Sequence, residues 1–266
     1  MIRMWVARTW FWVVPLFLIA HWVDMMNVPA PSDIALPLWS LDWSWMLSYW
    51  AGGTLLLSPI AAGVAVFLVG KGFPPDARAV VSPLPRGARP AFDIWAAVWL
   101  QGFAVQAVTL AIASLFCWVQ GGDPRGVTLP WQLVTAPVAL GAAVGVGVLA
   151  ALVVPRAWTL PAVVLGLFLG HRLFYTEGYP ELFTLEAAGY IVHNARPMPR
   201  HLASTVALNL VVGLMLALLV RFVLRVRGSR GAWLYVVGAG ALLVSALAIV
   251  LPWVWWGTGD TYEMLP

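Results

Sequence analysis

Charged residues are scarce in this chain. Asp, Glu, Lys and Arg make up only 10% of its 266 residues, whereas 62% are hydrophobic. A soluble domain usually carries about 25% charged residues, so this chain has too few to cover a surface that faces water. The composition therefore excludes a soluble globular protein and predicts an all-α, polytopic bundle of membrane helices.

Cysteine is nearly absent as well. The single residue, Cys117, excludes an internal disulfide and offers no thiolate cluster for zinc or an iron–sulfur centre. Histidines number only four, so we expect no metal site and no cofactor bound by this chain. The net charge of +4 would suit nucleic acid, but the positions of the basic residues fit membrane topology better, so we expect no nucleic-acid partner.

Catalytic and nucleotide-binding motifs are missing too. The fragment 63–72, GVAVFLVGKG, has the wrong spacing for a phosphate-binding loop, and no Ser or Thr follows Lys71. We therefore predict no catalytic residue and no enzyme activity of the chain by itself. A lipid-modifying or metal site is the alternative for one external group of residues, whose preferred interpretation is interfacial hydrogen bonding: His171, His193, His201, Glu177 and Glu181.

Long apolar runs are what the chain has in abundance. A membrane-crossing helix needs roughly 20 mostly apolar residues. Six runs of this kind fall at about 8–23, 48–70, 94–118, 132–154, 203–224 and 232–254. A shorter run at 158–170 is either a seventh span or a re-entrant segment. We expect the first run to be a retained span rather than a cleaved signal, because it lacks a small-residue cleavage site.

The charge distribution favours seven spans, with the N-terminus in the cytoplasm and the C-terminus outside. Cytoplasmic loops collect Lys and Arg. With seven spans, eleven of the fifteen basic residues lie inside, and nine of the eleven acidic residues lie outside. Without the short span, the basic cluster Arg221–Arg230 would fall outside. We therefore expect a multi-pass protein of the plasma membrane.

Tryptophan positions give a second indication of the same topology, because the indole ring prefers the membrane–water boundary. Predicted cytoplasmic ends of spans carry Trp10, Trp95, Trp158 and Trp233. Predicted outer ends carry Trp22, Trp50, Trp118, Trp131, Trp253 and Trp255. Two external connections are expected to lie along the membrane: residues 24–47, and residues 171–201 with a helical piece around Leu182, Leu185 and Tyr190.

The predicted spans contain few polar groups. Three carboxamides, Gln101, Gln106 and Asn209, either form interhelical hydrogen bonds or line a polar cavity. Ionisable side chains are nearly missing, which gives an ion-coupled carrier little to work with. Small residues such as Gly141 and Gly145 favour close helix packing, inside the chain or at a dimer face.

The longest predicted cytoplasmic loop, 71–93, contains the basic, proline-bracketed segment PPDARAVVSPLPRGARP. Pro74, Pro75 and Asp76 favour a helix start, and Pro83 and Pro85 end the helix after one or two turns. Such a segment is either a basic loop that touches anionic lipid or a docking element for a cytosolic partner.

The order of segments here resembles the ABC-2-type permease subunits of ATP-binding cassette transporters, in particular divergent actinobacterial members. The resemblance rests on 58-SPIAAGVAVFLVGKG-72, a short basic helix, the step Leu84-Pro85-Arg86 and a span rich in Trp and Ala. It implies that the loop holds a coupling helix that enters a cleft in a separate ATPase subunit, which binds ATP and Mg²⁺. The residues expected to contact that partner are Asp76, Arg78, Val81, Ser82, Leu84 and Arg86.

The resemblance also implies a dimer, with a second copy or a related permease, surrounded by membrane lipid. Permeases of this family usually have six spans, so we divide the chain into a six-span core (1–225) and an additional span with a short external tail (226–266). The expected function is a permease that exports a hydrophobic or amphipathic substrate. The alternatives are a membrane scaffold or assembly protein and, third, a membrane-embedded lipid-modifying enzyme.

Overall fold

The computed structural model of the chain describes residues 2–26, 41–81, 86–123, 131–174, 182, 195–225, 232–256 and 262–264. Its helices are α1 (Ile2–Met26), α2 (Trp43–Gly52), α3 (Thr54–Gly72), α4 (Pro75–Val81), α5 (Arg89–Val119), α6 (Trp131–Val153), α7 (Thr159–Phe174), α8 (Pro199–Arg225) and α9 (Ala232–Trp256). Every apolar run predicted as a span is helical, with the run 48–70 divided between α2 and α3, so the helical bundle is confirmed. The strands β1 (Ala195–Pro197) and β2 (Tyr262–Met264), which pair antiparallel, were not predicted.

Five helical segments are long and apolar enough to cross a membrane: α1, the α2–α3 unit, α5, α6 and α8. The described apolar stretches of α7 and α9, Thr159–Gly170 and Val237–Pro252, are shorter. The long apolar helices are those of a membrane protein. The count of seven spans and the orientation of the termini stay predictions.

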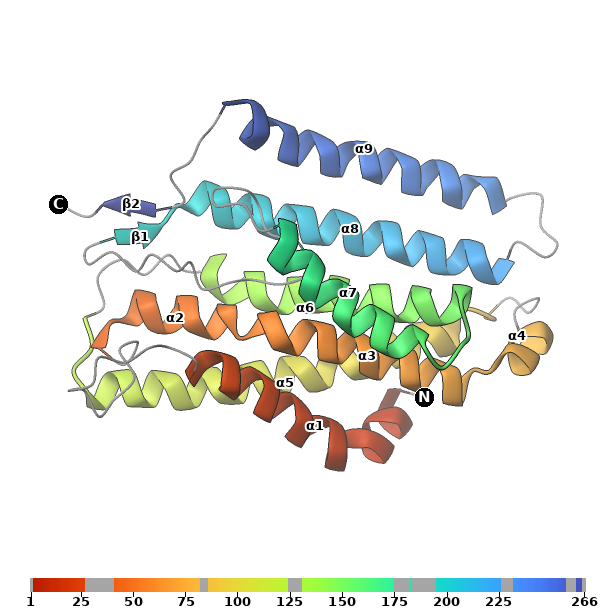
Figure 1. The fold of residues 1–266 in the computed structure, drawn as a ribbon, viewed down its shortest axis with the longest axis horizontal. Helices are drawn as coiled ribbons and strands as arrows, with labels where there is room; N and C mark the ends of the chain where they lie inside the picture. Colours follow the sequence, from red (N-terminus) through yellow and green to blue (C-terminus); the bar gives the residue numbers. More distant parts are fainter. Residues whose placement is uncertain are drawn as a thin grey trace.

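Successive long helices run in alternating directions (Figure 1). One end of the bundle carries the N-terminus of α1, the helix α4, the turn between α6 and α7, and the neighbouring ends of α8 and α9 (Figure 1). We call this the α4 end. The β1–β2 ribbon lies at the opposite end (Figure 1). The α4 end is the one that the charge distribution predicts to be cytoplasmic.

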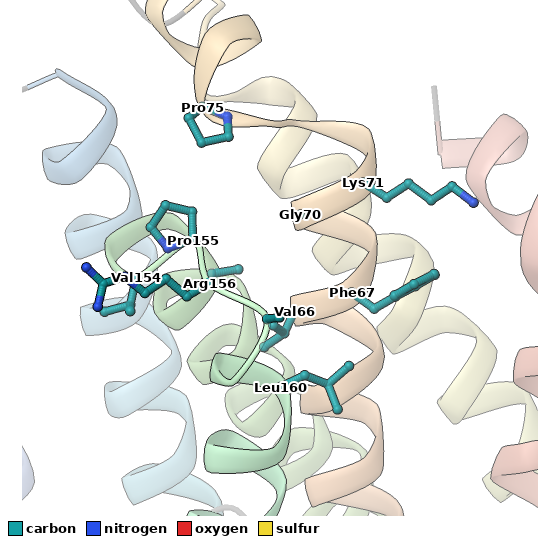
Figure 2. Close-up of a pocket in the computed structure, with 11 residues that line it drawn as sticks. Val66, Phe67, Gly70, Lys71, Pro75, Val154, Pro155, Arg156 and Leu160 are labelled. Atoms are coloured by element: carbon teal, nitrogen blue, oxygen red, sulfur yellow. The ribbon is translucent and has the colours of Figure 1, made fainter.

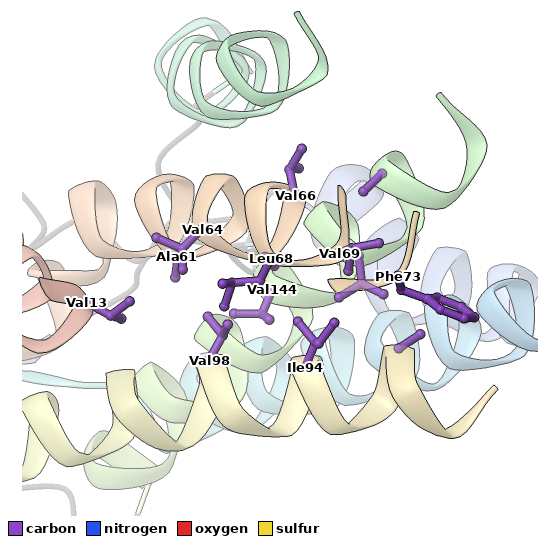
Figure 3. Packing of buried hydrophobic residues seen from close by; sticks show 14 of the residues in the cluster. Val13, Ala61, Val64, Val66, Leu68, Val69, Phe73, Ile94, Val98 and Val144 are labelled. Atoms are coloured by element: carbon purple, nitrogen blue, oxygen red, sulfur yellow. The ribbon is translucent and has the colours of Figure 1, made fainter. Parts of the chain in front are cut away.

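The largest buried cluster centres on α3. In Figure 3, Val64, Leu68 and Val69 of α3 lie close to Ile94 and Val98 of α5 and to Val144 of α6. These side chains are 5% exposed or less. The apolar helices therefore differ in burial. Helices α3 and α6 lie at the centre of the bundle, whereas α5 has one buried face and one exposed face. In membrane proteins, such an exposed apolar face is compatible with lipid.

Glycines let the central helices touch closely. A Cβ atom added at Gly147 of α6 would meet the backbone carbonyl oxygen of Ala62 in α3. Gly141 and Gly145 serve a different purpose, since added Cβ atoms there would meet the rings of Trp99 and Trp95. Packing within the chain, rather than a dimer face, is therefore what these glycines provide.

Three tryptophans have the exposure that the boundary interpretation requires, and their position at the boundary stays a prediction. Trp10, Trp118 and Trp158 are exposed, as anchoring at the membrane–water boundary requires. Trp50 is buried, so the prediction of a boundary anchor is wrong for it, whereas Trp95 is half-buried and its anchoring stays a prediction. The indole nitrogen of Trp50 donates to the carbonyl oxygen of Gln106 at 2.8 Å, and that of Trp95 to Gly141 at 2.9 Å.

The external connections differ from the prediction where they are described. Helix α2 begins at Trp43, within the stretch 24–47 assigned to the membrane surface, because the Asp42 carboxylate accepts hydrogen bonds from the backbone N–H groups of Ser44 and Trp45 at 2.7 and 3.1 Å. The predicted helical piece through Leu185 and Tyr190 lies outside the described residues.

Candidate docking site at the α4 end

The short helix predicted from the prolines is present. Pro75 occupies its first position, where the missing N–H costs no intrahelical bond, and Asp76 stands in the first turn, where the helix dipole favours a carboxylate. The backbone N–H of Arg78 donates to the Pro74 carbonyl at 3.0 Å. Helix α4 thus follows the end of α3 after only two residues, Phe73 and Pro74.

Arg78 ties this helix to two others. Its Nε donates to the carbonyl oxygen of Phe73 at 2.6 Å, and its Nη1 to that of Leu152 at 3.2 Å. The Leu152 carbonyl belongs to the last turn of α6, whose carbonyl groups have no intrahelical donor. A cation there also complements the helix dipole. Arg78 therefore caps α6 while holding α4 against the end of α3.

The environment of Arg78 is largely closed to solvent. The residue is only 9% exposed, and its guanidinium lies 5.8 Å from the centre of the Phe73 ring. Desolvation by burial lowers the pKa of Arg78 from its ordinary value. The ordinary pKa is so high that the side chain remains a cation at neutral pH. The charge is held by carbonyl oxygens and an aromatic face.

Helix α4 has one face in the core and one in the open. Ala77 and Val81, four residues apart, pack against the main buried cluster. Asp76 and Val80, also four residues apart, point outward, and Val80 is 74% exposed. An exposed valine four residues from an exposed carboxylate forms a small mixed surface of the kind that protein partners cover.

The predicted partner-contacting residues divide accordingly. Asp76 and Arg86 are exposed and available. Arg78 and Val81 face inward, so they attach α4 to the bundle and are not positioned to contact a partner. Ser82 and Leu84 lie outside the described residues. Val80 was missed, because helical spacing puts it beside Ala77 and its exposure depends on how α4 packs against the bundle.

A pocket of about 600 Å³ lies beside α4. One wall is formed by the last two turns of α3, and the other by residues 154–157 between α6 and α7 together with Leu160 (Figure 2). Its lining includes two cations, Lys71 and Arg156, and Pro75 at the start of α4. Figure 2 shows both basic side chains pointing away from the pocket, in opposite directions.

The predicted interior carboxamides are buried and do not line this pocket. Gln101 joins α5 to α1, since its Nε2 donates to Thr9 Oγ1 at 2.9 Å and to the Val6 carbonyl at 3.3 Å. The Nδ2 of Asn209 donates to the Thr205 carbonyl of its own helix at 2.9 Å. Gln106 is 1% exposed, and its backbone carbonyl accepts the Trp50 indole.

Buried charge is concentrated at the α4 end. Among the described residues, the buried side chains with a formal charge are Arg78 and Asp93. Asp93 lies in the second turn of α5, and its Oδ2 is 3.7 Å from Nε of Arg89. Because a buried charge is costly within a membrane protein, such residues are usually functional or structurally essential.

The external group that would build a metal or lipid-modifying site is described only in part. His201 is 8% exposed in the first turn of α8. The side chains of His171, Glu177, Glu181 and His193 lie outside the described residues. Within the part of the chain that the structure describes, no three His, Cys, Asp or Glu side chains are grouped so as to hold a metal ion.

Comparisons with models of known protein families, with curated proteins and with solved structures gave no match to this chain.

Proposed function

We propose that this chain is the membrane-spanning subunit of an ATP-driven transporter of the ABC-2 type, and that a separate cytosolic ATPase docks on the α4 end. One observation carries the proposal: a short helix outside the long apolar helices is bonded to the ends of two of them and leaves an apolar side chain, Val80, in the open. A loop that served only as a connection would need neither the buried arginine nor the exposed valine.

The contacts of Arg78 explain how force on α4 would reach the spans. Because Arg78 bonds to the end of α3 and to the last turn of α6, displacement of α4 acts on both helices together. These two helices meet backbone to backbone at Ala62 and Gly147, so they would move as one body. Packed units of this kind shift as rigid elements rather than deforming continuously.

The substrate and assembly are proposed from composition. The spans offer little charge, which suits a hydrophobic or amphipathic substrate moved outward. The partner would bind ATP and Mg²⁺, and a second copy or a related permease would complete the path. The seven-span topology, with the N-terminus in the cytoplasm and the C-terminus outside, belongs to the same proposal.

The test is recovery of an ATPase that depends on the outer face of α4. We would express the tagged chain at its native level in its own host, stabilise complexes with a crosslinker and identify the partners by mass spectrometry. Val80→Asp and Arg86→Glu are expected to abolish recovery of a nucleotide-binding subunit, since a charge placed at the centre of an interface, or reversed at its edge, opposes binding. Vanadate-sensitive ATP hydrolysis in the purified complex should fall in parallel.

The matched control is Arg8→Glu, which reverses an exposed charge in the second turn of α1. It should leave recovery and ATP hydrolysis unchanged. If the wild-type chain recovers partners but none hydrolyses ATP, the scaffold alternative is correct and the transporter proposal is overturned. The same conclusion follows if the ATPase binds Val80→Asp as well as it binds the wild type.

A further inference from the structure

The α2–α3 unit is interrupted where its two helices meet. One residue, Gly53, separates them, although together they are long and apolar enough to form one span. We call Gly53 and its two neighbours the joint. The backbone N–H of Leu56 donates to Oδ2 of Asp24 in α1 at 3.3 Å, whereas in an unbroken helix it would donate to the carbonyl of Gly52. The backbone beside the joint is thus held partly by a side chain from another helix.

A second side chain of α1 fills the joint. The imidazole of His21 is fully buried, and a Cβ atom added at Gly53 would lie 2.8–2.9 Å from three atoms of the ring. Gly53 itself has the ordinary helical angles φ −56° and ψ −9°, so glycine is needed here for space and not for backbone conformation. His21 and Asp24 are three residues apart, so both reach the joint from one side of α1.

The buried imidazole is poorly satisfied. Neither of its ring nitrogens has a partner with hydrogen-bond geometry among the described residues, although the backbone of Trp50 lies close to the ring. Burying a polar group without a hydrogen bond is unfavourable. Withdrawal of His21 from the joint would therefore recover free energy at the ring, which gives α1 a reason to leave this position.

Helix α1 also has a weak point, at Pro15. Proline has no N–H, so the carbonyl of Phe11 lacks its intrahelical donor. Before the proline, the hydroxyl of Thr9 accepts from Gln101 of α5 and ties the helix to the bundle. The helix lies at one edge of the bundle, with α9 at the opposite edge (Figure 1). Four outward side chains after the proline are exposed: Leu16, Ile19, Val23 and Met26.

We propose that residues 16–26 of α1 form a latch with two states. In the seated state, which the structure shows, His21 occupies the joint and Asp24 accepts the N–H of Leu56. In the released state the ring leaves the joint, the N–H of Leu56 returns to the Gly52 carbonyl, and α2 and α3 become one continuous helix. Because one N–H has two alternative acceptors, the change is between two discrete arrangements rather than gradual.

The balance between the two states has identifiable terms. Phe17 and Met25, both fully buried on the inner side of the latch, favour the seated state. The unpartnered nitrogens of His21 favour release. The latch does not rest on the transport proposal. Since α3 leads into α4 after two residues, however, a change at the joint occurs in the same unit that carries the docking helix.

The experiment measures the position of the latch by electron paramagnetic resonance between pairs of spin labels, on the purified full-length chain in lipid nanodiscs. Val23→Cys with Leu247→Cys reports on the latch, and Phe11→Cys with Leu234→Cys reports on the preceding part of α1. All four side chains are at least 50% exposed. Since α1 and α9 lie at opposite edges of the bundle, release should lengthen the first distance and leave the second unchanged.

Four variants change the balance in known directions. Gly53→Ala places a methyl group where the ring lies, so it should raise the ratio of released to seated molecules about 10-fold. Adding His21→Ala removes the clash and should restore the wild-type distance. Asp24→Leu removes the acceptor of the Leu56 N–H and should also favour release. The matched control, Asp24→Asn, keeps an acceptor oxygen and should stay seated.

Cys117, which is buried, is replaced by alanine in every sample, and melting curves verify that each variant is folded. If Gly53→Ala does not fold, Asp24→Leu decides the question. An unchanged latch distance in the variants expected to release would overturn the proposal, and so would a double variant in which the distance stays long. Lengthening of both distances would show that α1 detaches as a whole, which also excludes a latch. The measurement needs no ATPase, so its failure is distinct from failure of the transport proposal.

Discussion

Replacing Arg78 by Met tests how firmly α4 is attached to the bundle. Methionine keeps most of the length of the side chain but removes the donors to Phe73 and Leu152. A hydrogen bond from a charged group contributes about 1.5–3 kcal/mol. The loss is partly offset, because the variant no longer has the desolvation cost of a buried cation. We therefore expect a net loss of about 2 kcal/mol in the attachment of α4.

Amide hydrogen exchange of the chain in lipid nanodiscs measures this loss directly. Opening that is easier by about 2 kcal/mol raises the exchange rate about 30-fold. The faster exchange should be confined to peptides that cover α4 and the last turn of α6, while the centre of α3 keeps its protection. Arg78→Lys should fall in between, since one ammonium does not reproduce the fixed fork of a guanidinium.

The matched control for this measurement is Arg89→Met. Arg89 is 55% exposed, and its pair with Asp93, four residues on, is at 3.7 Å. Because Asp93 is buried, the loss of its partner falls on the first turns of α5, and the exchange of α4 should change less than about 3-fold. If Arg78→Met changes the exchange of α4 no more than Arg89→Met does, Arg78 does not hold the helix, and the proposed route of force through it fails.

Three other pairs of variants test the packing of the spans. Gly147→Ala places a methyl group against the Ala62 carbonyl and should destabilise the chain by about 1–3 kcal/mol. At Gly213 a new Cβ meets nothing within 4 Å, so Gly213→Ala should stabilise α8 by about 0.5–1 kcal/mol. Thermal melting in detergent compares the two variants. Trp50→Phe removes the donor to the Gln106 carbonyl and should lower the stability of the fold by about 1 kcal/mol. Trp118 is 71% exposed, so Trp118→Phe should not change the stability measurably in the same assay. Thr9→Val and Gln101→Leu should couple by about 0.6 kcal/mol in a double-mutant cycle, and additive effects would contradict the bond between them.

The helices were predictable because their signals are local. An apolar run of sufficient length has to be helical in a membrane, since each backbone polar group must be satisfied within the segment. The prolines around α4 act through the backbone of their own neighbours, so its bounds were close to the prediction. The start of α2 at Trp43 was missed, although Asp42, a favourable N-cap residue, precedes it directly.

The role of Arg78 was not predictable in the same way. An arginine in a cytoplasmic loop ordinarily faces water, and its partner Leu152 lies 74 positions away in the sequence. The contacts of the tryptophans were missed for a related reason. A ring at the end of a span suits the boundary, but Trp95 finds a carbonyl of α6 and a gap over Gly145 only once the helices have packed. In both cases the deciding contact is between distant segments.

The position of buried charge bears on which energy source would drive transport by such a chain. Ion-coupled carriers place ionisable groups where the ion has to bind, near the middle of the membrane. Here the charged residues that are buried in the described part of the chain belong to α4, as Arg78 does, and to the second turn of α5, as Asp93 does, both toward the α4 end. Arg78, one of these charges, connects the short helix α4 to the ends of α3 and α6. That arrangement favours energy delivered by contact from a partner over energy delivered by an ion.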